Sequence, residues 1–227
     1  DANPKPPKFP FLCLTVSGGH TMIVMVKDYF DMEIIGKTID DAAGEAFDKI
    51  GKIFDLNYPA GPIVDRLAKT GNANAFKFNK PRIDNYNYSF SGIKTSVLYF
   101  IQKEVQKNPN FIQENLADLC ASVQKTIVEI LMDKVEKAAK ELGINEVAIA
   151  GGVSANSGLR EAMTKNAEKL GWKIYIPKFE YTTDNAAMIA MVAKLKYDRG
   201  EFTDLSISAT ARYDIEESFK NDIQSQD

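Results

Sequence analysis

Three short runs of strand-forming residues follow one another near the start of this chain, and they constrain the fold more than any other feature. The runs cover residues 11–16, 22–26 and 32–37, separated by a few polar or glycine residues. Connections this short join antiparallel neighbours. Over residues 41–54 the apolar spacing changes to that of a helix. Three strands followed by a helix predict an antiparallel meander that opens an α/β domain.

The rest of the chain combines helices with buried strands. Helices are predicted at 63–69, 113–142 (one long helix or two), 158–170 and 186–195, and strands at 146–150 and 173–176. The run at 186–195 is apolar almost without interruption, which predicts a helix buried on most of its circumference. We therefore expect an α/β fold in which the meander is followed by a helical insertion, around residues 41–142, and a βαβα unit.

Composition is that of an ordinary soluble globular protein. The 227 residues are 44% hydrophobic and 26% charged, enough for one large domain or two small lobes. No apolar run approaches the roughly 20 residues that span a bilayer, and no signal peptide opens the chain. We therefore expect a cytoplasmic protein with no membrane partner. A net charge of −3 argues against a surface that coats nucleic acid broadly, so any such contact is expected to be local.

The ends of the chain differ in composition from its middle. Residues 1–10 are rich in proline and predict an extended lead-in, and residues 11–213 are expected to form the folded unit. The charged residues 214–227 predict a frayed tail. Cys13 and Cys120 lack the spacing of a metal or redox pair, so buried free thiols are expected.

A glycine turn links the first two predicted strands, at Ser17-Gly18-Gly19-His20. Glycines lack Cβ, so backbone N–H groups there could converge on a ligand oxygen. An ordinary two-residue hairpin turn explains the same pattern.

Two acidic segments follow the meander. Asp41, Glu45 and Asp48 share one helical face among small residues that leave the backbone approachable. This stripe could face a ligand or solvent, and Asp40 or Asp41 suits the helix N-cap. Further on, the loop 58–62 is stiffened by prolines, and Asp65 could accept hydrogen bonds from ribose hydroxyls or cap a helix.

A second glycine turn connects the strand at 146–150 to a helix, through Gly151, Gly152, Ser154 and Asn156. Open α/β sheets bind ligands at the carboxyl ends of their strands, which favours a nucleotide contact here over a plain connection. The glycine spacing fits neither a Rossmann nor a Walker motif.

Asp184 precedes the apolar helix and is interpreted either as its N-cap or as a metal ligand. His20 is the single histidine, so this chain cannot form a two-histidine metal site by itself.

Cations and aromatic residues alternate over residues 76–94. They could contact RNA by stacking and through phosphates, or belong to a packed loop.

Six motifs in this order resemble those of the TsaD family, formerly called Gcp. They begin at Ser17 (SGGHT), Ile39 (IDDAAGEAFDK), Tyr58 (YPAGP), Phe90 (FSGIKT), Ala150 (AGGVSAN) and Thr183 (TDNAAM). The family comprises tRNA N6-adenosine threonylcarbamoyltransferases, once misnamed O-sialoglycoprotein endopeptidases. The resemblance covers about residues 11–213.

This resemblance implies an actin-, Hsp70- and sugar-kinase-like fold, with RNase H-like lobes closing around a nucleotide. It implies transfer of a threonylcarbamoyl group from threonylcarbamoyl-AMP to N6 of adenosine 37, in tRNAs that read codons beginning with A. The residues expected at the activated substrate are Thr15, Val16, Ser17, Gly18 and Gly19. Those expected at its adenylate are Asp48, Gly61, Asp65 and Asn156. Asp184 is expected to ligate iron or zinc, and no catalytic residue is assigned. The expected partners are tRNA, a TsaB-like paralogue and a TsaE-like ATPase subunit.

The family's first lobe, with its metal-binding His-x-x-x-His, has no counterpart upstream of Pro10. We therefore expect a second lobe that is inactive by itself. An actin-like ATPase or small-molecule kinase and a non-catalytic scaffold paralogue remain alternatives.

Overall fold

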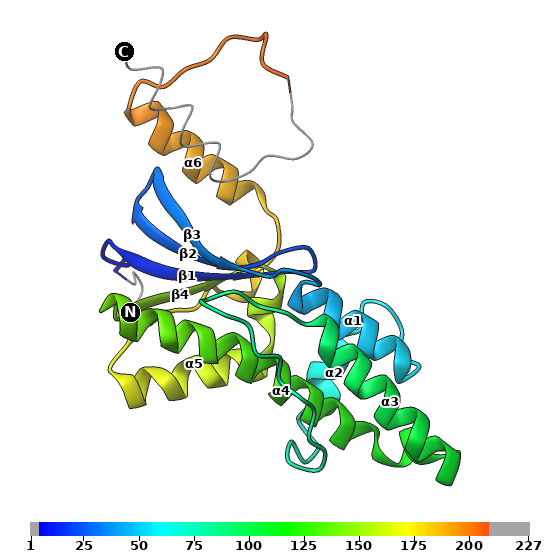
Figure 1. The fold of residues 1–227 in the computed structure, drawn as a ribbon. Helices are drawn as coiled ribbons and strands as arrows, with labels where there is room; N and C mark the ends of the chain where they lie inside the picture. Colours follow the sequence, from blue (N-terminus) through cyan, green and yellow to red (C-terminus); the bar gives the residue numbers. More distant parts are fainter. Residues whose placement is uncertain (1–4, 209–227) are drawn as a thin grey trace.

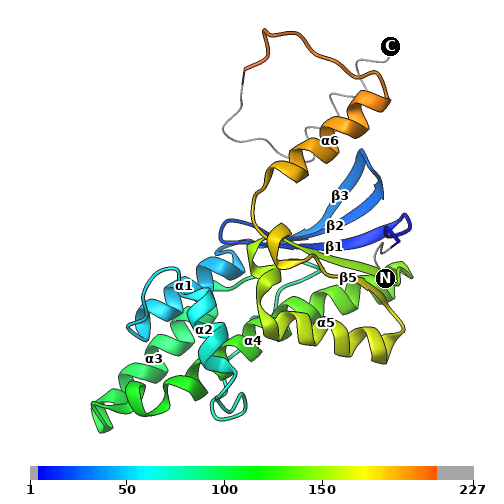
Figure 2. The same ribbon diagram turned by 180° about the vertical axis from the view of Figure 1, so that it is seen from behind.

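The computed structural model describes residues 5–208, so the predicted tail at 214–227 lies outside the described residues. Figure 1 shows a central sheet with most of the helices gathered on one of its sides and one helix on the other, and Figure 2 shows the same layers from behind. Among residues 5–208, no helix has both the length and the apolar character needed to cross a bilayer.

The predicted meander is confirmed. Strands β1 (Phe11–Val16), β2 (Thr21–Asp28) and β3 (Asp31–Lys37) pair antiparallel in succession. On β1 every second side chain is fully buried, at Leu12, Leu14 and Val16, because alternate residues of a strand point to the same face. That buried face packs against the helices.

The later strands extend the same sheet on the other side of β1. Strand β4 (Glu146–Ala150) lies parallel to β1, and β5 (Lys173–Tyr175) lies parallel to β4. The five-stranded order is β3-β2-β1-β4-β5. Strands β4 and β5 are joined through helix α5 (Ser157–Leu170), as in a βαβ unit. The predicted α/β class, with its meander and βαβα unit, is confirmed.

Helices α1 (Ala43–Ile53), α2 (Gly61–Ala68), α3 (Ser91–Lys107) and α4 (Phe111–Leu142) lie between the meander and β4. The patterns described above predict no element at α3, although Ile93, Val97 and Ile101 are buried at a spacing of four. Residues 113–142 belong to one helix of 32 residues, α4, and it ends at Gly143 with φ 67°. Along α4, Leu119, Val123, Ile127, Leu131 and Val135 are fully buried.

The segment that alternates cations with aromatics is a packed loop. Tyr88 and Phe90 are fully buried, and the Tyr88 hydroxyl donates to the Leu131 carbonyl at 3.3 Å. The ring of Phe76 packs against other phenylalanines. Lys80 pairs with Asp133 at 2.8 Å. Tyr88 and Phe90 therefore belong to the core, and Phe76 packs against it.

Asp40 caps a different helix from the one predicted. Helix α1 has Ala42 at its N-cap and no side-chain cap, so the proposal that Asp40 or Asp41 caps it is wrong. Asp40 instead accepts hydrogen bonds from Ser89, Phe90 and Ser91 at the start of α3. Burial opposes its ionisation, but these hydrogen bonds hold the pKa of Asp40 below its ordinary value.

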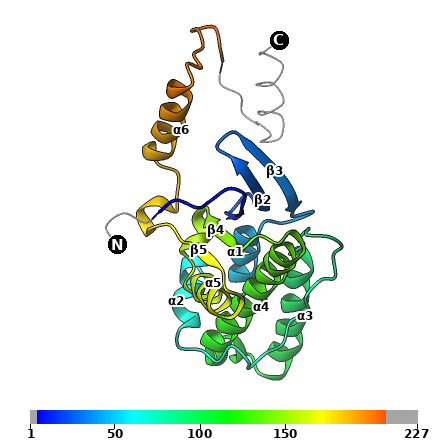
Figure 3. The same cartoon turned by 90° about the vertical axis from the view of Figure 1, so that its left-hand side faces the viewer.

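The predicted helix at 186–195 is confirmed as α6 (Ala186–Asp198), but its predicted burial is wrong. Ile189 is 74% exposed and Met191 63%. In Figure 3 α6 stands away from the helical layer, on the other side of the sheet. Its C-terminal end contacts the β2–β3 turn, where the Arg199 guanidinium lies 4.3 Å from the ring centroid of Phe30. Apolar composition predicts that a helix needs cover, but it does not say which element supplies it.

Glu146 ties the sheet to the lead-in segment. Its carboxylate accepts hydrogen bonds from the Tyr175 hydroxyl at 2.6 Å, the Lys8 N–H at 2.9 Å and the Lys173 ammonium at 3.1 Å. These contacts, led by that from Tyr175, lower the pKa of Glu146 from 4.5 to about 2. The stabilisation is complete above the unfolded-state pKa and is lost as pH falls through the folded-state value.

We expect Glu146→Gln to lower the free energy of unfolding by about 1 kcal/mol at pH 7, because charge-assisted hydrogen bonds become neutral ones. The difference from wild type should shrink as pH falls from 4.5 to 2. Urea unfolding at several pH values measures it, with the exposed Glu161→Gln as the control. A difference independent of pH would contradict the assignment.

Candidate functional site

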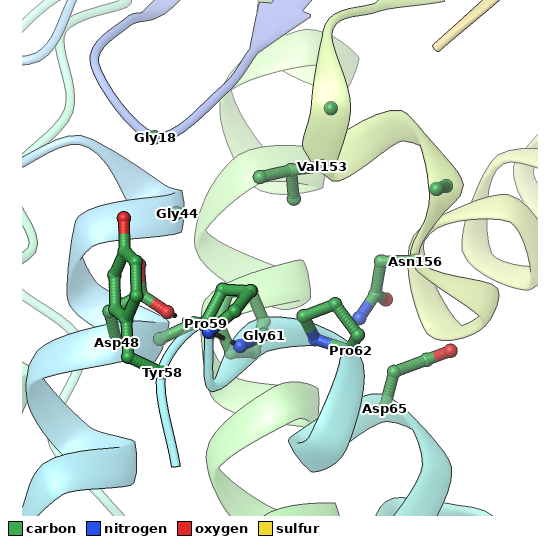
Figure 4. A pocket seen from close by; sticks show the side chains of 13 residues that line it. Gly18, Gly44, Asp48, Tyr58, Pro59, Gly61, Pro62, Asp65, Val153 and Asn156 are labelled. Atoms are coloured by element: carbon green, nitrogen blue, oxygen red, sulfur yellow. Dashed lines mark hydrogen bonds between the residues drawn. The ribbon is translucent and has the colours of Figure 1, made fainter. Parts of the chain in front are cut away.

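A cavity of about 370 Å³ opens beside the first glycine turn, at the edge where α1, α2 and the β4–α5 connection meet (Figure 4). The connection contains a short 3-10 helix, η1 (Gly152–Ala155). The lining residues are Gly18, Gly44, Phe47, Asp48, Tyr58, Pro59, Gly61, Pro62, Asp65, Gly152, Val153, Ala155 and Asn156. A cavity of this size falls in the range that holds small-molecule ligands.

The cavity brings together residues from motifs that are far apart in the sequence. Of the residues predicted to bind substrate, Gly18, Asp48, Gly61, Asp65 and Asn156 line it. The others are not among its lining residues: Thr15, Val16, Ser17 and Gly19. Val16 is fully buried in β1. The cavity therefore unites the four residues expected at the adenylate with one residue of the glycine turn.

The glycine turn uses most of its own backbone donors. The hydroxyl of Ser17 accepts from the N–H groups of Gly19 at 3.2 Å and His20 at 2.9 Å, and the Ser17 N–H donates to the His20 carbonyl at 2.8 Å. Within the described residues, the Gly18 N–H has no acceptor. A converging row of amides is therefore not formed, and the turn offers one donor at the cavity.

Small residues in α1 let the helix approach this turn. The Gly44 N–H donates to the Ser17 carbonyl at 3.1 Å, and a Cβ on Gly44 would lie 2.7 Å from that oxygen. The Ala43 N–H donates to the Thr21 hydroxyl at 2.9 Å. The sequence suggested that small residues leave the α1 backbone open to a ligand, but in the structure that backbone packs against the glycine turn.

Asp48 fixes the proline-containing loop along one side of the cavity. Its Oδ1 accepts from the Ala60 N–H at 2.7 Å and from the Gly61 N–H at 3.4 Å. Among the described residues, its other carboxylate oxygen has no hydrogen-bond partner. Asp48 therefore positions the loop and keeps one acceptor for a ligand.

Asp65 holds the opposite side of the cavity. Its Oδ1 accepts from both the N–H and the hydroxyl of Ser157, at 2.9 and 2.7 Å. The alternative role of a capping aspartate is therefore realised, but at the N-terminus of α5, 92 residues away. Here too only one oxygen is engaged within the described chain.

Asn156 is the N-cap of α5 and accepts the Leu159 N–H at 3.0 Å. Its amide nitrogen donates to the Oε1 of Gln124, on α4, at 2.7 Å. The sequence signal for Gln124 was weak: like Ser122 and Thr126, it is a polar residue in a mostly apolar part of α4.

Arg160 connects this region to the next loop, because its guanidinium donates to the carbonyls of Ser154 and Pro177. Ser154 is itself fully buried, and its hydroxyl has no partner in the described chain.

Asp184 lies apart from the cavity and is exposed. The N-cap of α6 is Asn185, which accepts the Met188 N–H at 3.2 Å, so the capping alternative for Asp184 is wrong. In the described part of the chain, no group of three or more histidine, cysteine or acidic residues could hold a metal ion. These residues therefore do not by themselves fit the expected metal.

The cavity is equipped to bind more than to react. Figure 4 shows Gly18 and Val153 above, Asp48 and Tyr58 on one side, and Asp65 and Asn156 on the other. The two aspartates offer free acceptors for hydroxyl or amino groups, between apolar surfaces. Among residues 5–208, those that line it include no histidine, cysteine, serine or lysine. The arrangement suits a nucleotide-sized ligand with hydroxyl groups.

Known proteins match this chain over most of its length. The sequence profile of the family "TsaD: tRNA N6-adenosine threonylcarbamoyltransferase" matches residues 1–191. The protein of that name from Riemerella anatipestifer is 78% identical over 215 residues, which cover 95% of this chain and 63% of the relative. The one from Christiangramia forsetii is 59% identical, covering 91% and 61%. The chain thus spans less than two thirds of the length of either relative.

One solved structure supports the fold. The crystal structure of full-length HypF in a phosphate- and nucleotide-bound form superimposes with a TM-score of 0.62 at 13% identity, covering 85% of this chain and 34% of HypF. The profile match and the identities to curated relatives identify the family as well as the fold. This chain belongs to the TsaD family of tRNA N6-adenosine threonylcarbamoyltransferases.

Proposed function

We propose that the full-length protein transfers the threonylcarbamoyl group of threonylcarbamoyl-AMP to N6 of adenosine 37, in tRNAs that read codons beginning with A, and that the cavity binds the adenylate. The observation that carries this proposal is the convergence of Asp48, Gly61, Asp65 and Asn156 on one cavity of about 370 Å³. Family membership supports the reaction type.

The cavity suggests an orientation for the substrate. Asp65 and Asn156 lie across the cavity from the Gly18 turn (Figure 4). Acceptors at Asp65 suit ribose hydroxyls, which would direct the phosphate and the carbamoyl group toward Gly18. The free Gly18 N–H would donate to an oxygen there. Thr15, Val16, Ser17 and Gly19 then act by shaping this turn, without contacting the adenylate.

The chemistry makes modest demands on the protein. The carbamoyl carbon is already activated as a mixed anhydride. Attack by N6 forms the C–N bond and breaks the C–O bond, AMP leaves with the electron pair, and N6 loses a proton. Positioning the amine against this carbon is the main contribution required. No lining residue is assigned as the base.

Asp184 is a proposed ligand for iron or zinc whose companions must come from outside the described residues. tRNA is the proposed acceptor, and a TsaB-like paralogue and a TsaE-like ATPase are proposed to complete the assembly. A tRNA-modifying role fits a protein of the cytoplasm.

We expect the full-length protein, mixed with its partner proteins, tRNA and threonylcarbamoyl-AMP, to produce threonylcarbamoyladenosine, measured by mass spectrometry of digested tRNA. AMP should bind in calorimetry, and Asn156→Ala should weaken that binding about tenfold through the loss of a polar contact. ATP turnover without tRNA modification would favour the kinase or ATPase alternative. Failure to bind either nucleotide would favour a scaffold.

A further inference from the structure

Gln124 is a buried polar side chain that the proposed reaction does not yet use. It lies on α4 and is 7% exposed, between Val123 and Ile127, which are fully buried. Burying an amide in apolar surroundings costs free energy unless its polar atoms are paired. Its partner is Asn156, which is 8% exposed and lines the cavity. The contact therefore joins the core helix to the proposed adenylate site.

Donor and acceptor chemistry fixes the orientation of both amides. The Leu159 N–H can only donate, so the Asn156 atom at 3.0 Å from it must be the oxygen Oδ1. The nitrogen Nδ2 of Asn156 then faces Gln124, and Gln124 must present its own oxygen, at 2.7 Å. A backbone donor in α5 thus sets the Asn156 amide, and Gln124 supplies its second restraint.

Gly158 gives the Gln124 side chain the room it needs. A Cβ at Gly158 would lie 2.8 Å from Nε2 and 3.3 Å from Cδ of Gln124. Gly158 belongs to the first turn of α5, two residues after the cap. Gln124 is therefore held against the backbone of the same helix end that presents Asn156.

We infer that Gln124 is a positioning residue for nucleotide binding: it holds the Asn156 amide so that one Nδ2 hydrogen and one Oδ1 lone pair remain directed away from the protein, for the ligand. This inference rests on the proposed adenylate site. An Asn side chain makes up to four hydrogen bonds, and the two described here use one donor and one acceptor. Without Gln124, rotation about the side-chain torsions of Asn156 costs less, and binding must then supply the ordering.

The first test compares three variants of the full-length protein by calorimetric titration with AMP. Gln124→Met keeps length and apolar packing but removes the acceptor, and it should raise the Kd for AMP about tenfold. Gln124→Glu keeps an acceptor for Asn156 next to a helix N-terminus, and it should stay within about threefold of wild type. Thr126→Val is the matched control: Thr126 is also 7% exposed on α4, but its hydroxyl donates to the Ser122 carbonyl. Its Kd should be unchanged.

A double-mutant cycle shows whether Gln124 acts through Asn156. Asn156→Ser keeps a capping oxygen for α5 and removes the amide nitrogen. In that background Gln124→Met should change the Kd for AMP less than twofold, because the contact is already absent. Thermal unfolding of each variant accounts for any loss of folded protein.

The outcomes distinguish a failure of the positioning role of Gln124 from a failure of the proposed adenylate site. If wild-type protein does not bind AMP, the proposed adenylate site is wrong. If wild type binds AMP but Gln124→Met binds it equally well, the positioning role is overturned. It is also overturned if the loss of AMP affinity caused by Gln124→Met adds fully to the loss caused by Asn156→Ser. An increase in the Kd for AMP in Gln124→Glu as large as that in Gln124→Met would overturn it as well.

Discussion

We expect Asp48→Ala to weaken AMP binding by the full-length protein about a hundredfold, from the loss of a charged acceptor with two backbone partners. In the structure, one carboxylate oxygen of Asp48 accepts from the N–H groups of Ala60 and Gly61. Ala60 is 2% exposed, so its N–H would be left without a partner in a place that water reaches poorly. The loop that forms one side of the cavity would then move, and the oxygen left for the ligand would be lost with it.

Two controls sharpen this expectation. Asp48→Asn retains an oxygen for the Ala60 N–H but loses the charge, so we expect a loss of about tenfold. Glu45→Ala removes a carboxylate from the same helix that, within residues 5–208, forms just an exposed ion pair with Lys49, and it should alter the Kd for AMP less than twofold. Calorimetry with AMP measures all three. An Asp48→Ala protein that binds AMP as wild type does would show that the loop forms without Asp48.

Local patterns in the sequence predicted local structure well. The strand predicted at 11–16 and the helical spacing over 113–142 each depend on the residues of one element, and both elements were confirmed, as β1 and α4. Glycine, proline and acidic residues also marked the segments 17–19, 58–65 and 151–156 as candidate ligand-binding turns and loops. Such signals depend on a residue and its near neighbours, which are visible in any sequence.

Partnerships between distant residues could not be predicted in the same way. Either Asp40 or Asp41 was expected to cap α1, but Asp40 accepts hydrogen bonds at the start of α3, about 50 residues later, because the Thr38–Tyr88 bridge brings that segment alongside. Asp65 caps α5 for a similar reason. For such carboxylates the sequence shows the capacity to accept hydrogen bonds, but only the tertiary structure shows from which donor.

Hydrogen bonding within the Ser17 turn was also hidden from the sequence. A serine before two glycines can leave the backbone donors free or bind them with its own hydroxyl. The structure has the second arrangement, with Gly19 and His20 bound to Ser17. The turn therefore contributes two things to the site: it forms part of the cavity wall, and it offers the Gly18 N–H as a donor.

The second large effect concerns Gly151, which follows β4 at the edge of the cavity. Gly151 has φ 88°, and a Cβ there would lie 2.4 Å from the carbonyl oxygen of Val16, in the buried strand β1. We expect Gly151→Ala to lower the free energy of unfolding by about 3 kcal/mol or more, since positive φ and a backbone collision both cost free energy. AMP binding should weaken as well, because relief of the collision moves the β4–α5 connection that carries Asn156.

Two other glycines separate these contributions. Gly143 has φ 67°, but a Cβ there would meet no atom of the described chain within 4 Å, so Gly143→Ala should cost only about 1 kcal/mol, from conformation alone. Gly152→Ala, beside Gly151 and also unobstructed, should have a smaller effect than either. Urea unfolding of the full-length variants gives the order. If Gly151→Ala and Gly143→Ala prove equally destabilising, then the Val16 backbone moves away from the new Cβ at little cost. In that case the close approach of β1 to the β4–α5 connection is not what holds this edge of the cavity in place.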